Sequence, residues 1–243
     1  MIELKNVSKQ YENQVVLKHI NLKIASGELV CLVGPSGSGK TTLIKMLNRL
    51  LDASSGEILL DGKNILKQAI IPLRLNMGYV LQQIALFPHM TIFENITLML
   101  ELKKIPKNQW LPLAKEWLTK VDLDPEKFLS RYPHELSGGQ QQRIGIVRAL
   151  ISSPKILLMD EPFSALDPLN RRQLQDLIKQ LQQELGLTII FVTHDMSEAK
   201  RIADKIALLH EGKLVQYDTV ESLIQHPKNE WVAQFLQGSE SRE

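Results

Sequence analysis

The spacing of apolar and polar positions along the chain predicts an α/β fold. Short apolar runs at residues 29–33, 77–81, 156–159 and 188–192 have the length of buried strands. Between them, apolar residues recur at the spacing of one helix face, as at Leu174, Leu177, Ile178, Leu181 and Leu185. Alternating strands and helices are typical of a sheet that is covered by helices.

The patterns near the N-terminus and near the end of the chain predict antiparallel strands. Residues 2–33 are predicted to form strands, with Ile20, Leu22 and Ile24 alternating with polar neighbours. Residues 57–62 read as a strand followed by a hairpin turn, and residues 206–217 read as a final hairpin. We therefore expect a mixed sheet core with antiparallel strands near the N-terminus.

Residues 91–150 have helical periodicity and few strand signals. Ser137 is a favourable N-cap for a helix that runs to about residue 150, and Gly138 and Gly139 leave its first N–H groups accessible. This pattern indicates a helix start that can bind an anion. An apolar stripe within the region favours the packed core of a helical subdomain over a cofactor site: Trp110, Leu113, Ala114, Trp117, Leu118 and Val121.

Composition narrows the class of protein. The chain has 243 residues, with 44% hydrophobic and 23% charged residues, which is ordinary for a globular protein. A formal net charge of +2 is too small to indicate binding to a nucleic-acid backbone. We see no signal peptide and no apolar run near the ~18 residues of a membrane span, so we expect a cytosolic chain or one held at a membrane by a partner.

Residues 34–41 fit the pattern G-x-x-x-x-G-K-[ST] at every fixed position. A glycine-rich turn could match by chance, but the apolar strand before it and the amphipathic helix predicted over residues 40–51 favour a phosphate-binding loop. Glycines without a Cβ let the backbone approach a ligand closely, and the helix dipole favours negative charge. The loop consists of Gly34, Pro35, Ser36, Gly37, Ser38, Gly39, Lys40 and Thr41.

Polar residues follow the other apolar strands. Gln82 comes after residues 77–81, Asp160 and Glu161 come after residues 156–159, and His194 comes just after residues 188–192. Ligands of open α/β sheets bind at the carboxyl ends of strands, which favours a functional role for these side chains over a solvated loop or a structural histidine. Tyr11, in a preceding loop, is suited equally to adenine stacking and to packing.

Taken in order, these pieces resemble the ATPase subunit of ABC transporters over residues 2–236. Tyr11 matches the adenine-stacking aromatic, residues 34–42 match Walker A, and Gln82 matches the Q-loop. Residues 156–161 match Walker B and the glutamate that follows it. Residues 164–167 match the D-loop, and His194 matches the switch histidine. The signature motif corresponds to Leu136, Ser137, Gly138, Gly139 and Gln140.

The resemblance implies one ABC ATPase domain over residues 1–237, followed by a flexible tail at residues 238–243. A RecA-like core at about 1–85 and 155–220 would enclose a helical subdomain at about 88–152, with C-terminal helices at about 219–237. ATP and Mg²⁺ are the implied ligands. Residues implied to bind the nucleotide are Tyr11, residues 34–42 including Thr42, Gln82, residues 137–140, Asp160, Asp167 and His194.

The resemblance also implies roles. Thr41, Gln82 and Asp160 would hold the metal, and Lys40, Gln82, Glu161 and His194 would act in catalysis, with Glu161 as the general base. Signature residues of a second copy would cap the γ-phosphate in a head-to-tail homodimer.

Residues 78–92 further resemble importers of quaternary amines such as glycine betaine, carnitine and choline. A transmembrane permease and, indirectly, an extracytoplasmic binding protein are the implied partners. The implied location is the cytoplasmic face of the membrane.

Two other classes compete with a transporter subunit. Soluble ABC-type ATPases that act on DNA or ribosomes carry coiled coils, zinc modules or two nucleotide domains, and we see none of these between Lys40 and Asp160. The chain could also be a metabolite kinase with a phosphate loop, but that interpretation does not account for the signature motif or for Asp167. Import of another small solute stays open, because this subunit does not read the substrate.

Overall fold

The computed structural model describes residues 1–12, 14–83, 85–164 and 166–238. The chain divides into two units: unit 1 consists of Met1–Leu73 and Leu181–Glu243, and unit 2 is Arg74–Gln180. The division falls within helices α2 (Ile70–Leu75) and α7 (Pro168–Leu185). Most of the tail predicted at residues 238–243 lies outside the described residues, and Gly238 ends helix α10 (Glu230–Gly238).

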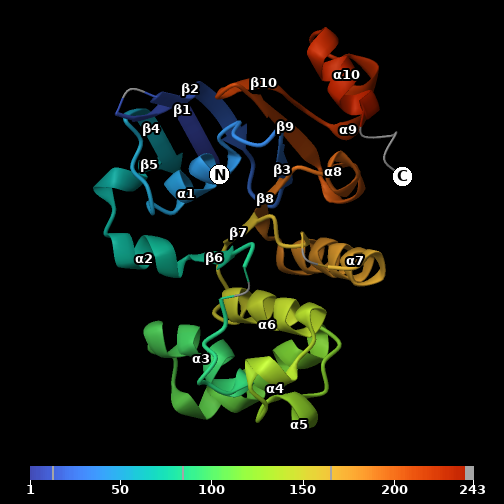
Figure 1. Cartoon of the computed structure of the whole chain (residues 1–243). Helices are drawn as coiled ribbons and strands as arrows, with labels where there is room; N and C mark the ends of the chain where they lie inside the picture. The colour runs from blue at the N-terminus through green and yellow to red at the C-terminus, as the bar shows by residue number, and fades with distance from the viewer. Residues whose placement is uncertain (13, 84, 165, 239–243) are drawn as a thin grey trace. The chain divides into compact units, whose positions relative to one another are not determined.

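Unit 1 contains an antiparallel sheet in the order β2-β1-β4-β5 (Figure 1). Its strands are β1 (Ile2–Tyr11), β2 (Gln14–Ile24), β4 (Ser55–Leu60) and β5 (Lys63–Asn64). Ile20, Leu22 and Ile24 are all buried, because alternate positions of β2 face the core. This confirms the antiparallel strands expected near the N-terminus.

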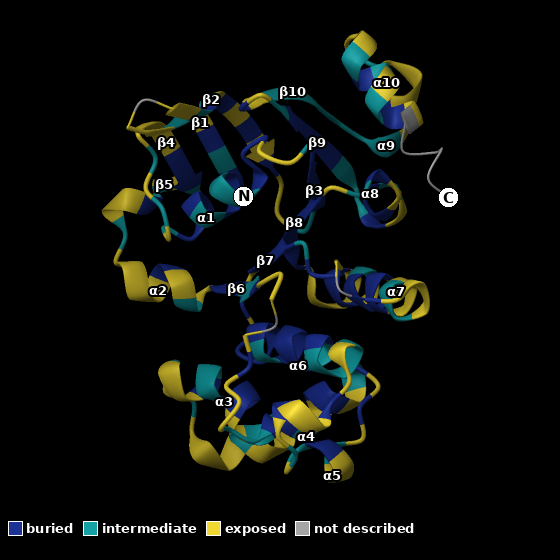
Figure 2. Cartoon of the chain, in the orientation of Figure 1, coloured by how far each residue is buried: buried dark blue, intermediate teal, exposed yellow. Residues whose placement is uncertain are grey.

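Four further strands of unit 1 run in the order β10-β9-β3-β8. Strand β3 (Leu29–Val33) pairs in parallel with β8 (Thr188–Thr193) and β9 (Lys205–His210), and β10 (Lys213–Asp218) pairs antiparallel with β9. Every residue of β3 is buried (Figure 2), as its unbroken apolar run predicts. The helices of this unit include α1 (Lys40–Leu47), α8 (Met196–Ile202) and α9 (Val220–Gln225).

Unit 2 contains a parallel pair, β6 (Met77–Val80) and β7 (Ile156–Asp160), and the helices that lie between them in sequence. Those helices are α3 (Ile92–Leu102), α4 (Trp110–Lys120), α5 (Pro125–Phe128) and α6 (Gly138–Leu150). Ala114, Trp117 and Leu118 of α4 are buried, which confirms the helical segment and the core role of its apolar stripe.

Helix α1 is shorter than the pattern predicts. It ends at Leu47 with Asn48 as its C-cap, and Arg49 adopts a left-handed backbone conformation with φ 55°. The Leu50 N–H then donates to the Lys45 carbonyl oxygen at 2.9 Å. Leu50, which lies within the helix predicted over residues 40–51, is outside α1 and exposed.

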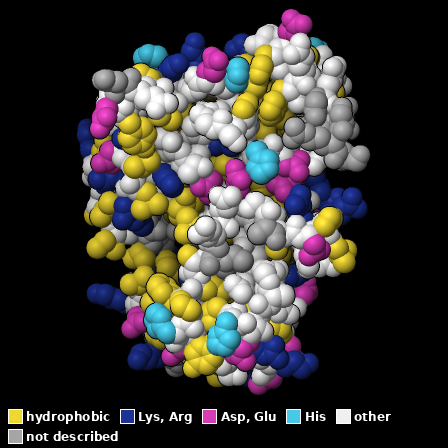
Figure 3. Space-filling view, viewed as in Figure 1, with side chains coloured by type: hydrophobic (Ala, Val, Ile, Leu, Met, Phe, Trp, Pro, Cys, Tyr) yellow, Lys and Arg dark blue, Asp and Glu magenta, His cyan; other side chains and the backbone are white. Residues whose placement is uncertain are grey.

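On the face shown in Figure 3, Lys and Arg side chains are interspersed with Asp and Glu, and hydrophobic side chains lie between them. Large exposed hydrophobic residues of unit 2 include Leu81, Phe87 and Tyr132. Among the described residues, none of the helices combines the length and the apolar character that a bilayer crossing requires.

Candidate functional site

In unit 1, the predicted phosphate loop joins the buried end of β3 to the start of α1. Gly39 precedes the helix in a left-handed conformation with φ 99°, and a Cβ there would run into the Leu17 side chain. A Cβ at Gly34 would collide with the carbonyl oxygen of Leu209. Both positions therefore require glycine, and this requirement comes from contacts within the unit itself.

Lys40 is held against the loop that it follows. Its side chain is buried, and Nζ donates to the carbonyl oxygens of Gly34 at 2.8 Å and Pro35 at 2.9 Å. These bonds keep the ammonium group directly beside the backbone turn. A positive charge in this place, next to the N-terminus of α1, suits a phosphate ligand.

Ser38 gives an independent reason to assign an anion to this loop. Its side chain is buried, yet Oγ has no hydrogen-bond partner among the described residues. Such a group costs free energy unless a ligand or water completes it. Its Oγ lies 3.0 Å from the position that a Cβ of Gly34 would take, so the two residues line the same small space.

His194 reaches the same edge of the sheet as the phosphate loop. Strand β8 pairs in parallel with β3, and the register places Thr193 opposite Val33. The next residues, His194 and Gly34, therefore leave the two strands side by side. The His194 side chain is exposed. The structure thus brings together two of the elements that the sequence predicted.

Tyr11 ends β1 and is exposed, so its ring is accessible for stacking. Lys9 Nζ lies 4.9 Å from the centre of that ring, a cation–π distance. Adenine stacking stays a prediction.

In unit 2, the other predicted strand-end residues also follow two strands that pair in parallel. Val80 of β6 lies opposite Met159 of β7, so the chain segments that carry Gln82 and Glu161 leave neighbouring strands. Asp160 is buried, Gln82 is exposed, and Glu161 adopts a left-handed backbone conformation with φ 46°. Conformations of this kind in non-glycine residues cluster at functional sites.

Tyr79 of β6 adds to the electrostatics around Asp160. Burial, with a further contribution from the Asp160 charge, raises the pKa of the Tyr79 hydroxyl. The phenol is therefore a neutral donor near neutral pH, and its oxygen has no partner among the described residues.

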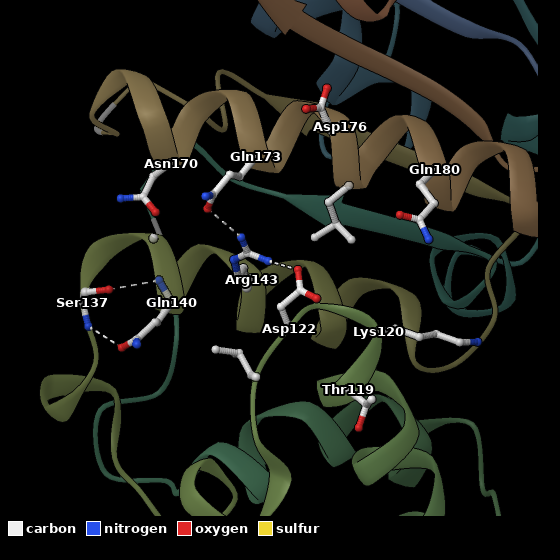
Figure 4. A pocket seen from close by; sticks show the side chains of 13 residues that line it. Thr119, Lys120, Asp122, Ser137, Gln140, Arg143, Asn170, Gln173, Asp176 and Gln180 are labelled. Carbon is white, nitrogen blue, oxygen red and sulfur yellow. Dashed lines mark hydrogen bonds and ion pairs between the residues drawn. The ribbon is translucent and has the colours of Figure 1, made fainter.

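The predicted signature motif forms the start of α6. Ser137 is the N-cap: its Oγ accepts from the Gln140 N–H at 3.3 Å, and Gln140 Oε1 accepts from the Ser137 N–H at 3.0 Å. This is a capping box, as in Figure 4. A Cβ at Gly138 would meet nothing within 4 Å, so this helix start has space in front of it.

Asp167, from the predicted D-loop, is connected to the signature helix through Asn170. Asn170 donates to Asp167 from its backbone at 3.1 Å and from its side chain at 2.6 Å, and these bonds lower the pKa of the Asp167 carboxyl. The Asn170 side chain also lies 3.3 Å from the position that a Cβ of residue Gly139 would take. No motif or pattern in the sequence indicated a role for Asn170. Ala165, also in the D-loop, lies outside the described residues.

A polar cavity of about 780 Å³ continues from this helix start, between α6 and the part of α7 up to Gln180 (Figure 4). Arg143 crosses it, donating to the Val121 carbonyl oxygen at 2.8 Å, to Asp122 at 3.1 Å and to Gln173 at 3.3 Å. Arg143 therefore fixes α6 against α7 and the turn after α4.

The segment after Gln82 is held by hydrogen bonds from two side chains of unit 2. Asn95 of α3 is fully buried and binds both the N–H and the carbonyl group of Phe87, at 2.8 and 3.1 Å. Arg148 of α6 donates to the Ala85 carbonyl oxygen at 2.6 Å, and burial lowers its pKa. Phe87 itself remains exposed, so the segment presents an apolar ring from a fixed backbone.

Comparison with known proteins decides the family. The family model described as "ABC transporter" matches residues 17–164, more than half of the chain. The chain belongs to the ABC transporter family.

Two relatives in this ABC transporter family are each 52% identical to the chain over 237 residues. They are the choline transport ATP-binding protein OpuBA and the glycine betaine/carnitine/choline transport ATP-binding protein OpuCA, both of Bacillus subtilis. In each case the match covers 97% of the chain and 62% of the relative. The chain therefore spans about three fifths of the length of these curated relatives.

Among solved structures of ABC proteins, a dimeric ATP-binding cassette in a post-hydrolysis state, bound to ADP and Pi, is 35% identical with a TM-score of 0.81. The match covers 90% of this chain and 99% of that one. It confirms the predicted ABC ATPase fold. The roles of the individual site residues and the predicted subdomain boundaries stay predictions.

Proposed function

We propose that the chain is the ATP-hydrolysing subunit of an ABC importer for quaternary amine osmoprotectants of the glycine betaine, carnitine and choline type. The observation that carries this proposal is the 52% identity to OpuBA and OpuCA, whose names state such transport. Two features of the phosphate loop support nucleotide binding. Lys40 is buried, and the Ser38 hydroxyl has no hydrogen-bond partner among the described residues.

The nucleotide would be held by backbone and side chains of the phosphate loop. Lys40 neutralises the β- and γ-phosphates, Ser38 donates its hydroxyl, and Tyr11 stacks on adenine. Thr41, Gln82 and Asp160 supply oxygen ligands, the donor type that Mg²⁺ prefers in combination with phosphate oxygens. When bound, Mg²⁺ supplies charge neutralisation at the phosphates.

Hydrolysis needs a base and a group that stabilises the γ-phosphate. Glu161 accepts the proton of the attacking water, and its position directly after the buried strand β7 supports that role. His194 follows β8 beside the phosphate loop, so its imidazole donates to the γ-phosphate. No covalent intermediate is required, because the water attacks phosphorus directly and ADP leaves.

A second copy completes the site. The start of α6, with Ser137 as its cap and open space at Gly138, would meet the γ-phosphate bound by the other copy, and Asp167 would lie at the same interface. The dimeric assembly of the similar cassette supports this arrangement. Binding of two ATP molecules then closes the homodimer, and hydrolysis reopens it.

Closure acts on a transmembrane permease at the cytoplasmic face of the membrane. The exposed Phe87, held by Asn95 on the segment that follows Gln82, supports contact with a short element of that permease. An extracytoplasmic binding protein would deliver the solute to the permease. We propose no nucleic-acid partner, in line with the interspersed charges on the face in Figure 3.

The transport assignment is tested by reconstitution of the chain with its permease and binding protein in vesicles. Glycine betaine, carnitine or choline is expected to raise ATP turnover severalfold, because closure is coupled to solute delivery. An amino acid and a polyamine serve as control solutes. Stimulation by a control solute alone would replace the quaternary amine assignment and leave the ATPase assignment intact.

Ser137→Arg is expected to leave ATP affinity of the monomer unchanged and to reduce dimer formation at least tenfold, because a bulky cation fills the space in front of α6. Sedimentation with ATP in a Glu161→Gln background measures the dimer. Ser130→Arg, which makes the same change at another exposed serine of unit 2, is the matched control. Equal dimer formation by both variants would remove the signature helix from the interface.

A further inference from the structure

Thr193, the last residue of β8, lies directly before His194 and is almost completely buried, at 2% exposure. Its hydroxyl donates to Glu198 Oε2 at 2.6 Å and accepts from the Asp195 N–H at 3.0 Å. One side chain therefore contacts the residue that follows His194 and a carboxylate in the first turn of α8.

Glu198 is unusual for a carboxylate in its degree of burial. It is 7% exposed and lies on the face of α8 that packs against β3 and β8. Burying a carboxylate is costly unless it is paired or hydrogen-bonded. The short bond from Thr193 offsets part of that cost and makes the geometry of the pair well defined.

The start of α8 does not require this pair as a cap. Asp195 is the N-cap, and its Oδ1 accepts from the Ser197 N–H at 2.8 Å and from the Ser197 hydroxyl at 2.6 Å. The Thr193–Glu198 bond is therefore additional to the capping that begins the helix. What it adds is a fixed path for the chain between β8 and α8, in which the His194 side chain is exposed.

The backbone of His194 is consequently held from both sides. Before it, Thr193 is in register with Val33, whose next residue begins the phosphate loop. After it, the Asp195 N–H is bound to the Thr193 hydroxyl. Because the backbone fixes the position of Cβ and restricts the rotamers of the side chain, this network limits the directions in which the imidazole can point.

We propose that Thr193 and Glu198 are positioning residues that aim His194 at the γ-phosphate; the inference rests on the catalytic role of His194 in the proposed function. Both side chains are almost completely buried, and the pair acts through the histidine. Its loss lowers the rate of the chemical step and leaves ATP binding unchanged.

The test compares Thr193→Val, which removes the hydroxyl at constant shape, with Thr193→Ser, which keeps it. Each is made in the wild-type chain and in a His194→Ala chain. Phosphate release is measured in single turnovers with protein in excess, ATP affinity is measured separately, and thermal unfolding verifies the fold. Glu198→Met and Glu198→Gln form a second pair, which removes or keeps an acceptor oxygen, for use if Thr193→Val does not fold.

In the wild-type background, Thr193→Val is expected to lower the single-turnover rate about ten- to 100-fold, since misplacing a catalytic group by 1 Å can cost about 10² in rate. Thr193→Ser stays within about twofold, as does the ATP affinity of the Thr193 and Glu198 variants in the wild-type background. In the His194→Ala background, Thr193→Val has no further effect, because the histidine that it aims is absent.

Three results would overturn the inference in distinguishable ways. An equal fall caused by Thr193→Val in both backgrounds assigns the pair a purely structural role and leaves His194 catalytic. An unchanged rate for His194→Ala alone removes the histidine from catalysis and the positioning role with it. A Thr193→Val rate equal to that of the wild type overturns the positioning role only.

Discussion

Glu161→Gln is expected to bind ATP with unchanged affinity, to lose about 10²–10⁴ in hydrolysis rate and to accumulate as an ATP-bound dimer. The amide has the shape of the carboxylate but cannot accept the proton of the attacking water. Asp160 and the phosphate loop are untouched, so nucleotide binding and closure proceed while the step that reopens the dimer does not. Phosphate release and sedimentation with ATP measure the two effects.

Glu101→Gln is the matched control, since it makes the same change at an exposed glutamate of α3 in the same unit. It should hydrolyse ATP at the wild-type rate and show no persistent dimer. If Glu161→Gln kept a rate within about threefold of the wild type, another group would have to be the base. A slow variant without dimer accumulation would instead indicate that Glu161 acts before closure.

Lys40→Ala is expected to weaken ATP binding by about 10- to 150-fold, the range that corresponds to one hydrogen bond to a charged group. The variant removes the only full positive charge in the eight-residue loop, and it also removes the bonds to the carbonyl oxygens of Gly34 and Pro35. We expect the turnover rate to fall by a larger factor than the ATP affinity, because the variant lacks the positive charge that neutralises the transferred phosphoryl group. A titration with a fluorescent ATP analogue measures affinity.

Lys45→Ala is the matched control, because Lys45 lies in the last turn of the same helix, away from the loop. The variant loses the same charge and should bind ATP normally. Thermal unfolding separates a binding defect from loss of the fold, since Lys40 also satisfies buried carbonyl groups. Unchanged affinity and turnover in a folded Lys40→Ala protein would contradict the assignment of residues 34–41 as the nucleotide site.

The elements that sequence reasoning located are those with strong local signals. The apolar runs at β3, β7 and β8, the period-2 pattern of β2 and the N-cap at Ser137 are each properties of a few consecutive residues, and the structure confirms them. The strand-end positions of Gln82, Glu161 and His194 followed from the same runs. The family then followed from the order of the motifs, which similarity to known proteins confirms.

The features that sequence reasoning missed depend on residues that meet only after folding. The early end of α1 results from the left-handed Arg49, and nothing in the apolar spacing of Leu43 to Leu50 indicates it. Asn170 became relevant only when α7 placed it against both Asp167 and Gly139. Glu198 looks like an ordinary helix glutamate until its burial beneath β8 is seen, and no local pattern reveals that burial.

The backbone of Glu161 has a consequence for stability. A left-handed glutamate is disfavoured by roughly 1–3 kcal/mol relative to ordinary conformations, whereas glycine tolerates a positive φ. Replacement of Glu161 by glycine would relieve that strain and, under the proposed mechanism, would remove the general base. A gain in thermal robustness at this position would therefore be accompanied by a loss of turnover.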